Sequence, residues 1–199
     1  MKYAVRSIIS GLALSLALAA PVLAGPQEDA EAAYAADQKG DFATAMKLYQ
    51  TAAAGGSAYG MYSVGLMYFD GKGVDRSYVN AMKWYKQGAE KGYPQAQHAM
   101  GSMYEQGQGV KRDIAEAAKW YTMSANQGYV MSQNALGVIY TTGDAALPPN
   151  PVQAYYWFTL ASKEDASAAT RASRMKARMK PEDLAAAEKL VKDFKPAKK

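Results

Sequence analysis

Hydrophobic positions in residues 93–128 follow the spacing of two amphipathic helices. The first set recurs at i, i+4, i+7 and i+8, which places its members on one helical face. A second set follows a short polar stretch. Gly107 and Gly128 stand where the helices are expected to end, because glycine adopts the left-handed cap conformation at little cost. The two stripes are Ala96, Met100, Met103 and Tyr104, then Ala117, Trp120, Tyr121 and Ser124.

The same pattern returns every 36 residues, which predicts three similar helix pairs. Gly65, Gly101 and Gly137 mark the period, and tyrosine, alanine and tryptophan positions follow in register. In the third copy the second helix slips by one residue, which an insertion in the loop 143–149 explains. Stacked pairs bury a continuous core, so the pattern predicts an all-α solenoid. The repeats are expected at 57–92, 93–128 and 129–165.

The glycines inside the first helix of each pair need a physical reason, because each costs about 1 kcal/mol relative to alanine. A tryptophan follows in the second helix of every copy. Burial of an indole removes roughly 150–250 Å² from water, which at about 25 cal/mol/Å² exceeds the glycine cost. We therefore expect indoles to pack over the bare glycine backbone, pairing Trp84, Trp120 and Trp157 with Gly65, Gly101 and Gly137.

The segments on either side of the three copies are expected to cap the array. Residues 27–56 carry a weaker version of the pattern, with a first loop shortened to Gly40-Asp41-Phe42, and form a degenerate first repeat. Residues 166–194 predict two capping helices, and residues 195–199 predict a disordered basic tail. Terminal units of solenoids differ from internal ones because one of their faces meets solvent.

The first 24 residues have the pattern of a secretory signal peptide. Lys2 and Arg6 precede an apolar run of about 14 residues, which is shorter than the roughly 20 that a membrane span needs. Small residues at Val22-Leu23-Ala24 fit a cleavage site. We expect cleavage after Ala24 and export to the periplasm or outside a bacterial cell, with an uncleaved anchor as the alternative. No later segment is long and apolar enough to span a bilayer.

The segment from Ala96 to Gly128 carries a distinctive series of residues. Met-Gly is followed by a tyrosine, two loop glycines, a valine, an aspartate and a Trp-Tyr pair. This series resembles the Sel1-like repeat, a relative of the tetratricopeptide repeat, and the first unit is closer to an ordinary tetratricopeptide repeat. The resemblance implies a right-handed α-solenoid that acts as a protein-binding scaffold. Bacterial members include envelope regulators, assembly adaptors and secreted host-interaction factors.

Composition excludes several kinds of chemistry. The chain has no Cys and one His, which excludes disulfides, thiolate or multi-His metal sites and a Cys nucleophile. No motif supplies His98 with a catalytic partner. We therefore predict no enzymatic activity, no cofactor and no metal. The alternative is a cell-wall enzyme, which needs paired carboxylates, and Glu105 and Glu116 show no pairing pattern.

Positions that differ between the copies are free to carry recognition. In solenoids of this kind the first helix of each pair lines the concave groove, where a protein segment would meet mixed polar and aromatic side chains. The alternative is that these side chains only solvate the surface. The candidate groove consists of three sets, namely Met61, Gln97 and Gln133; Tyr62, His98 and Asn134; and Phe69, Glu105 and Thr141.

Positive charge is concentrated near the C-terminus. Residues 25–162 carry 10 basic and 12 acidic side chains, and residues 163–199 carry 11 and 6. A basic surface on one predicted helical face is either plain solvated surface or a contact site for an anionic surface or acidic partner. Nucleic acid is not expected, because the body is negative and the chain is exported. The basic residues are Arg171, Arg174, Arg178 and Lys180.

Overall fold

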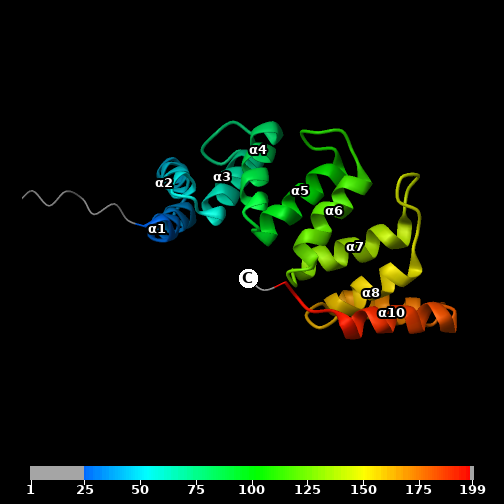
Figure 1. The fold of residues 1–199 in the computed structure, drawn as a ribbon. Helices are drawn as coiled ribbons and strands as arrows, with labels where there is room; N and C mark the ends of the chain where they lie inside the picture. The colour runs from blue at the N-terminus through cyan, green and yellow to red at the C-terminus, as the bar shows by residue number, and fades with distance from the viewer. Residues whose placement is uncertain (1–24, 198–199) are drawn as a thin grey trace, which may run out of the picture.

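The computed structural model describes residues 25–197, so the predicted signal peptide lies outside the described residues. Within this range ten helices pack in consecutive pairs, which confirms the predicted all-α solenoid. The pairs follow one another along a bent path from α1 to α10 (Figure 1). The helices are α1 Pro26–Gln38, α2 Phe42–Ala54, α3 Ala58–Asp70, α4 Tyr78–Glu90, α5 Pro94–Gln106, α6 Ile114–Ala125, α7 Val130–Thr142, α8 Pro151–Ala161, α9 Ala166–Lys176 and α10 Pro181–Asp193.

The second helix of each repeat begins at a short polar side chain. Ser77, Asp113 and Asn150 each accept a hydrogen bond from the backbone amide three residues further on, at 3.3, 2.9 and 3.0 Å. This bond satisfies an amide that has no partner inside the helix. Gly107 ends α5 with φ +70° in the left-handed conformation, as its position in the sequence predicts.

The glycines inside the first helices pack against tyrosine or phenylalanine, so the prediction of tryptophan at these contacts is wrong. A Cβ placed on Gly101 would lie 2.6 Å from Cδ1 of Tyr121. A Cβ placed on Gly65 would likewise lie 2.5 Å from Cδ1 of Tyr85. Successive side chains on a helix differ in direction by about 100°, so the residue after the tryptophan faces the glycine. The structure therefore has the predicted packing of a large ring against a glycine, but the ring belongs to the residue after the tryptophan.

The tryptophans instead fill the core between consecutive repeats. Trp157 is 4% exposed and lies in one cluster with Ile114 and Tyr121 of the preceding pair and with Leu136 of its own. Trp84 and Trp120 are partly buried against the corresponding clusters, which include side chains of the repeat before each one. The indoles therefore hold one repeat to the next.

Two further helices follow the last repeat. Helix α9 packs on α8 as α7 packs on α6, and α10 also packs on α8. Ala187 of α10 is fully buried there. The chain then runs back toward the connection between α6 and α7 (Figure 1), where the Ala197 amide donates to the Asn126 carbonyl at 2.8 Å. No helix in residues 25–197 is both long and apolar enough to cross a membrane.

Candidate functional site

Residues that differ between repeats surround the ring that covers each helical glycine. In the repeat 57–92, the ring of Tyr62 lies 5.6 Å from that of Tyr85, and the ring of Phe69 lies 6.4 Å from it. In the next repeat the ring of His98 lies 5.1 Å from that of Tyr121. In both repeats a tyrosine ring covers the helical glycine, and the side chains beside that ring differ.

The same arrangement continues with different chemistry further along the array. The Tyr121 hydroxyl donates to Glu105 Oε2 at 2.6 Å. In the third repeat Thr141 stands at the position of Glu105, and its hydroxyl donates to the Gly137 carbonyl at 2.7 Å. Phe158 replaces Tyr121 and has no hydroxyl. The face therefore changes from aromatic in the first of these repeats to polar in the second, and the third combines Phe158 with the polar Asn134 and Thr141.

Aromatic rings connect this face across the repeat junctions. The ring of Tyr93 lies 5.5 Å from that of Tyr62 and 6.2 Å from that of Tyr59, and His98 lies 5.4 Å from Tyr129. Burial raises the pKa of Tyr93 to about 12, and nearby tyrosine hydroxyls add to the shift. Burial raises the pKa of Tyr62, and the Tyr129 hydroxyl, which lies two repeat junctions further along the chain, adds to the shift. These contacts join side chains of three successive repeats on one side of the array, which we identify as its concave face.

A chain of hydrogen bonds fixes the orientation of His98. The Ser132 hydroxyl donates to Ser124 Oγ at 2.8 Å, and the Ser124 hydroxyl donates to the Pro94 carbonyl at 2.8 Å. Each hydroxyl has one proton, so the 2.9 Å contact between His98 Nδ1 and Ser132 Oγ requires Nδ1 to donate. Burial lowers the pKa of His98 to about 4. The imidazole is therefore neutral near pH 7, with Nε2 as an acceptor.

Three of the predicted groove residues are structural, and their assignment to the groove is wrong. Met61, Gln97 and Gln133 are only 6%, 3% and 3% exposed. The Gln97 side-chain amide donates to the Ala89 carbonyl at 3.1 Å, and that of Gln133 donates to the Ala125 carbonyl at 3.2 Å. Both bonds join the first helix of a repeat to the second helix of the preceding one. Met61, Gln97 and Gln133 each directly precede a residue of the concave face, so their side chains point about 100° away from that face around the helix.

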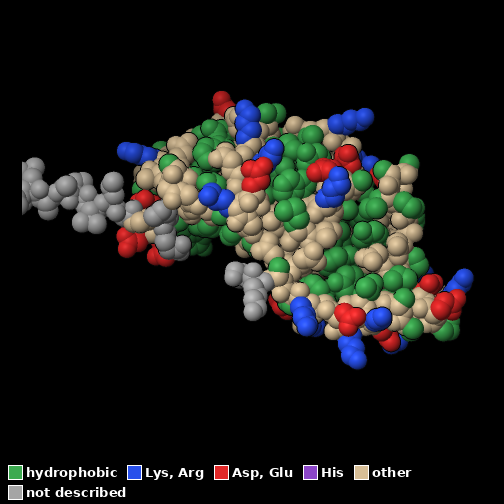
Figure 2. Space-filling model, viewed as in Figure 1, with side chains coloured by type: hydrophobic (Ala, Val, Ile, Leu, Met, Phe, Trp, Pro, Cys, Tyr) green, Lys and Arg blue, Asp and Glu red, His purple; other side chains and the backbone are tan. Residues whose placement is uncertain are grey.

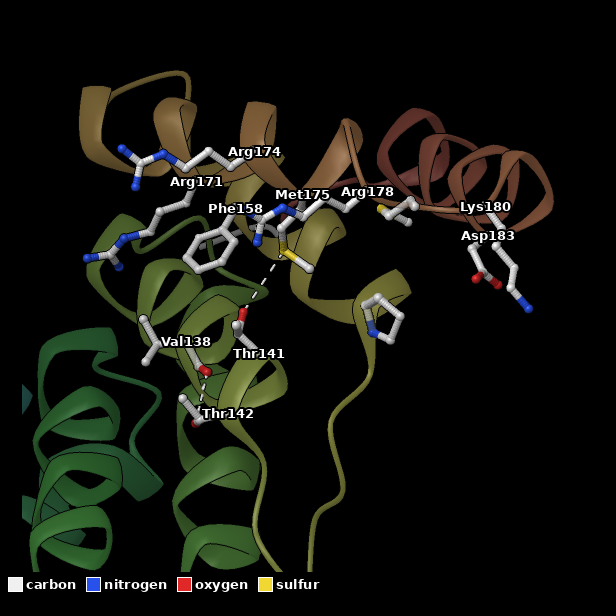
Figure 3. Close-up of a pocket in the computed structure, with 12 residues that line it drawn as sticks. Val138, Thr141, Thr142, Phe158, Arg171, Arg174, Met175, Arg178, Lys180 and Asp183 are labelled. Carbon is white, nitrogen blue, oxygen red and sulfur yellow. Dashed lines mark hydrogen bonds between the residues drawn. The ribbon is translucent and has the colours of Figure 1, made fainter.

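A cavity of about 680 Å³ lies at the C-terminal end of the concave face, between α7, α8, α9 and the start of α10. Val138, Phe158 and Met175 supply much of its apolar wall, and Figure 3 shows them facing one another across it. Four basic side chains and one acidic side chain also line it. These are the predicted basic residues Arg171, Arg174, Arg178 and Lys180, together with Asp183.

Arg171 joins the basic surface to the groove. Its Nη1 donates to Asn134 Oδ1 at 3.0 Å, and its guanidinium lies 5.6 Å from the centre of the Phe158 ring. The Asn134 side-chain amide in turn donates to Asp165 Oδ2 at 2.8 Å. Asp165 is already engaged as the cap of α9, where it accepts bonds from two backbone amides. Arg171 therefore bonds a neutral amide, and among the described residues it forms no direct ion pair with a carboxylate.

The face shown in Figure 2 has a different character. Hydrophobic side chains gather there in patches between helix pairs, and basic and acidic side chains are interspersed around them. Two carboxylates of the described residues are held in ion pairs: Glu116 accepts from Lys119 Nζ at 2.7 Å, and Glu188 accepts from Lys176 Nζ at 2.9 Å. Within residues 25–197, no cluster of three His, Asp or Glu residues could hold a metal ion.

The sequence comparison identifies the repeats. The Sel1 repeat model matches residues 30–57, 58–93, 94–129 and 130–165. The chain belongs to the Sel1 repeat family. This confirms the resemblance drawn from the residue pattern, and no curated protein matches the chain.

Solved structures support the Sel1 assignment. One is a protective antigen present in uropathogenic Escherichia coli strains, which displays an SLR fold; it is 27% identical with a TM-score of 0.75. The match covers 85% of this chain and 37% of the antigen, so the chain spans well under half of that protein. A Sel1 repeat protein from Oxalobacter formigenes is 25% identical with a TM-score of 0.70, and the match covers 84% and 72% of the two chains.

The Sel1 register explains why sequence reasoning missed the cavity. Phe158 occupies the position of Tyr121, and α9 takes the place that the first helix of a further Sel1 repeat would fill. Met175 and Val138 belong to no repeated pattern, so nothing in the sequence marks them as wall residues. The one available signal is the series of basic residues Arg171 and Arg174 on α9 and Arg178 in the turn after it.

Proposed function

We propose that this Sel1 repeat protein is an exported, non-enzymatic scaffold that binds a segment of a partner protein on its concave face. The observation that carries the proposal is the position of the variable residues. Tyr62, His98 and Asn134 occupy equivalent places on this face, and the row leads into the cavity beside Phe158. Sel1 repeats typically mediate protein interactions.

The chemistry of the face suits a protein segment better than a small metabolite. Tyrosine rings offer apolar area together with a hydroxyl, and they lose little conformational freedom on binding. His98 adds an acceptor at Nε2, and Glu105 adds a carboxylate that already holds Tyr121 in place. A row of such groups across three repeats matches an extended chain, which presents side chains and backbone groups at regular intervals.

Export is the second part of the proposal and rests on residues 1–24, which have the pattern of a signal peptide. An exported scaffold would meet its partner in the periplasm or outside the cell, in envelope regulation, envelope assembly or contact with a host. The antigen of uropathogenic Escherichia coli has the same fold. Edman sequencing of the exported chain tests this part, with Gly25 as the expected first residue.

Site-specific photo-crosslinking tests the binding face. Benzoylphenylalanine replaces Tyr62 on the concave face in one variant and Met123 in the control. Met123 is 46% exposed and lies two residues after Tyr121 on α6, about 200° around the helix from the concave side. Crosslinks made in living cells are then read by mass spectrometry.

We expect the variant at Tyr62 to capture a defined protein that the variant at Met123 does not capture. Capture of the same protein with equal yield from both positions, or from Met123 alone, would contradict the assignment of the concave face.

A further inference from the structure

The structure adds a chemical class of ligand to the proposed function, on which this inference rests. We infer that the cavity between α7, α8 and α9 takes an acidic protein segment in which an apolar side chain is flanked by aspartate or glutamate. The cavity has an apolar wall and a rim that carries four basic side chains against the single acid Asp183.

The apolar wall requires an apolar occupant. Val138, Phe158 and Met175 come from three different helices and face a shared volume of about 680 Å³, which lies within the usual range for ligand sites. Figure 3 shows the Met175 sulfur and the Phe158 ring directed into this space above Val138. A leucine, methionine or phenylalanine side chain placed there would leave water and contact all three.

The basic rim requires negative charge. Among the described residues, Arg174 and Arg178 have no ion pair or hydrogen bond with another side chain, and Arg171 bonds only the neutral Asn134. Lys176, on the other side of the same helix, is paired with Glu188 at 2.9 Å. The charges that face the cavity are therefore the unpaired ones. Arginine is well suited to bind carboxylates because its planar guanidinium can donate two parallel bonds.

The spacing of the arginines matches an extended segment. Arg171 and Arg174 lie three residues apart on α9, which corresponds to about 4.5 Å along the helix axis. Arg178 follows in the turn after α9, which ends at Lys176. Side chains on the same side of an extended chain repeat at about 6.6 Å. Carboxylates at alternate positions of a bound segment can therefore reach neighbouring guanidinium groups. The side chain between them is directed elsewhere, so an apolar residue before or after the acidic pair would fill the cavity.

The location favours a protein segment over an anionic membrane. The cavity continues the concave row through the bond between Arg171 and Asn134, so a segment on the concave face leads directly into it. A membrane surface is broad and nearly flat, and it meets protruding side chains more readily than those lining a hollow on the inner side of a curve. Vesicle binding therefore serves as the competing outcome of the experiment.

Peptide selection tests this inference. A phage library of random dodecapeptides is selected on the chain produced without its first 24 residues. Selected peptides are synthesised, and their affinities are measured by fluorescence anisotropy at low and high salt. The test variant carries Arg171→Gln, Arg174→Gln and Arg178→Gln. The control carries Lys163→Gln, Lys176→Gln and Lys189→Gln, which removes the same charge from residues that do not line the cavity.

We expect selected peptides to be enriched in Asp or Glu beside Leu, Phe, Ile or Met, and to bind more weakly at high salt. The arginine variant should bind them at least about tenfold more weakly, because charged hydrogen bonds are lost, and the lysine variant should bind as the parent does. Circular dichroism verifies the fold of both. Thr141→Glu places a negative charge at the exposed rim and should weaken binding to a similar extent.

The failures can be told apart. Peptides that lack acidic residues, or that bind all variants equally, would overturn this inference while the concave scaffold still stands if the crosslinks from Tyr62 succeed. Arginine-dependent binding of phosphatidylglycerol vesicles without any selected peptide would overturn the inference in favour of a lipid surface. The absence of both selected peptides and crosslinks would contradict the proposed function itself.

Discussion

Substitution of Gly101 by alanine tests the packing that holds each helix pair together. A Cβ at this position would lie 2.6, 2.7 and 2.9 Å from Cδ1, Cε1 and Cγ of Tyr121, and ordinary carbon contacts are about 3.5–4.0 Å. The ring must therefore shift by roughly 1 Å. It is 2% exposed, and its hydroxyl is held by Glu105, so little free space is available.

The expected magnitude follows from two opposing effects. Overpacking of a core costs about 1–3 kcal/mol. We expect a cost near the upper end of this range, because the Tyr121 ring that must move is buried and held by Glu105. Alanine regains about 1 kcal/mol of helix propensity. We expect Gly101→Ala to lower the free energy of unfolding by about 2 kcal/mol, which corresponds to a fall of about 4–8 °C in Tm for a chain of this length.

Combining Gly101→Ala with a second substitution shows whether Tyr121 or Trp120 packs against this position. In a Tyr121→Ala background the clashing atoms are gone, so Gly101→Ala should stabilise the chain by up to about 1 kcal/mol. In a Trp120→Ala background it should still destabilise. Urea unfolding, followed by circular dichroism at 10 °C, gives the free energy of unfolding of the parent, the three single variants and the two double variants. A loss in the Tyr121→Ala background as large as in the parent, or a reversal of sign in the Trp120→Ala background, would refute the packing described above.

Three further outcomes are expected. Burial lowers the pKa of His98 from 6.5 to about 4, so between these values the unfolded chain takes up a proton that the folded chain does not. The contribution of His98 to stability is therefore full above pH 6.5 and falls by up to about 3 kcal/mol as the pH drops toward 4. Urea unfolding at pH 7 and pH 4.5 should show a smaller difference in stability for His98→Gln than for the parent. Gln97→Ala should cost about 1–3 kcal/mol in urea unfolding because it leaves buried groups without partners, and binding of selected peptides to the folded chain should not change. Gly107→Ala should cost about 1–2 kcal/mol in thermal unfolding because its φ is +70°. The His98 prediction fails if the pH dependence of stability is the same in His98→Gln, and the other two fail if the substitution leaves the free energy of unfolding unchanged.

The periodic features of the fold could be predicted from the sequence. The 36-residue period placed the helix pairs, and Ser77, Asp113 and Asn150 marked helix starts because capping depends on local backbone geometry. The partner of Gly101 was misassigned because periodicity shows that a large residue must face the glycine, whereas a small rotation about the helix axis decides between neighbours. Tyr121 rather than Trp120 has the required direction.

The candidate site was predicted only in part, for the same reason. Tyr62, His98 and Asn134 differ between copies and lie on the concave face. The position before them also differs, with Met61 in one copy and glutamine in two, and its side chains are buried. Variation alone therefore does not separate a binding residue from an interface residue. The cavity depends on where α9 packs, which no repeat in the sequence determines.

Hydrogen exchange, measured by mass spectrometry with and without the tightest selected peptide, tests the central claim most directly. The bound peptide should slow exchange in α7 and α9, on both sides of the cavity, and in the first turn of α5, near the tyrosine row. Exchange in α4 and α6 should change little, apart from the segments that precede α5 and α7. Protection confined to α4 and α6, with none in α7 or α9, would show that the chain binds through its other face.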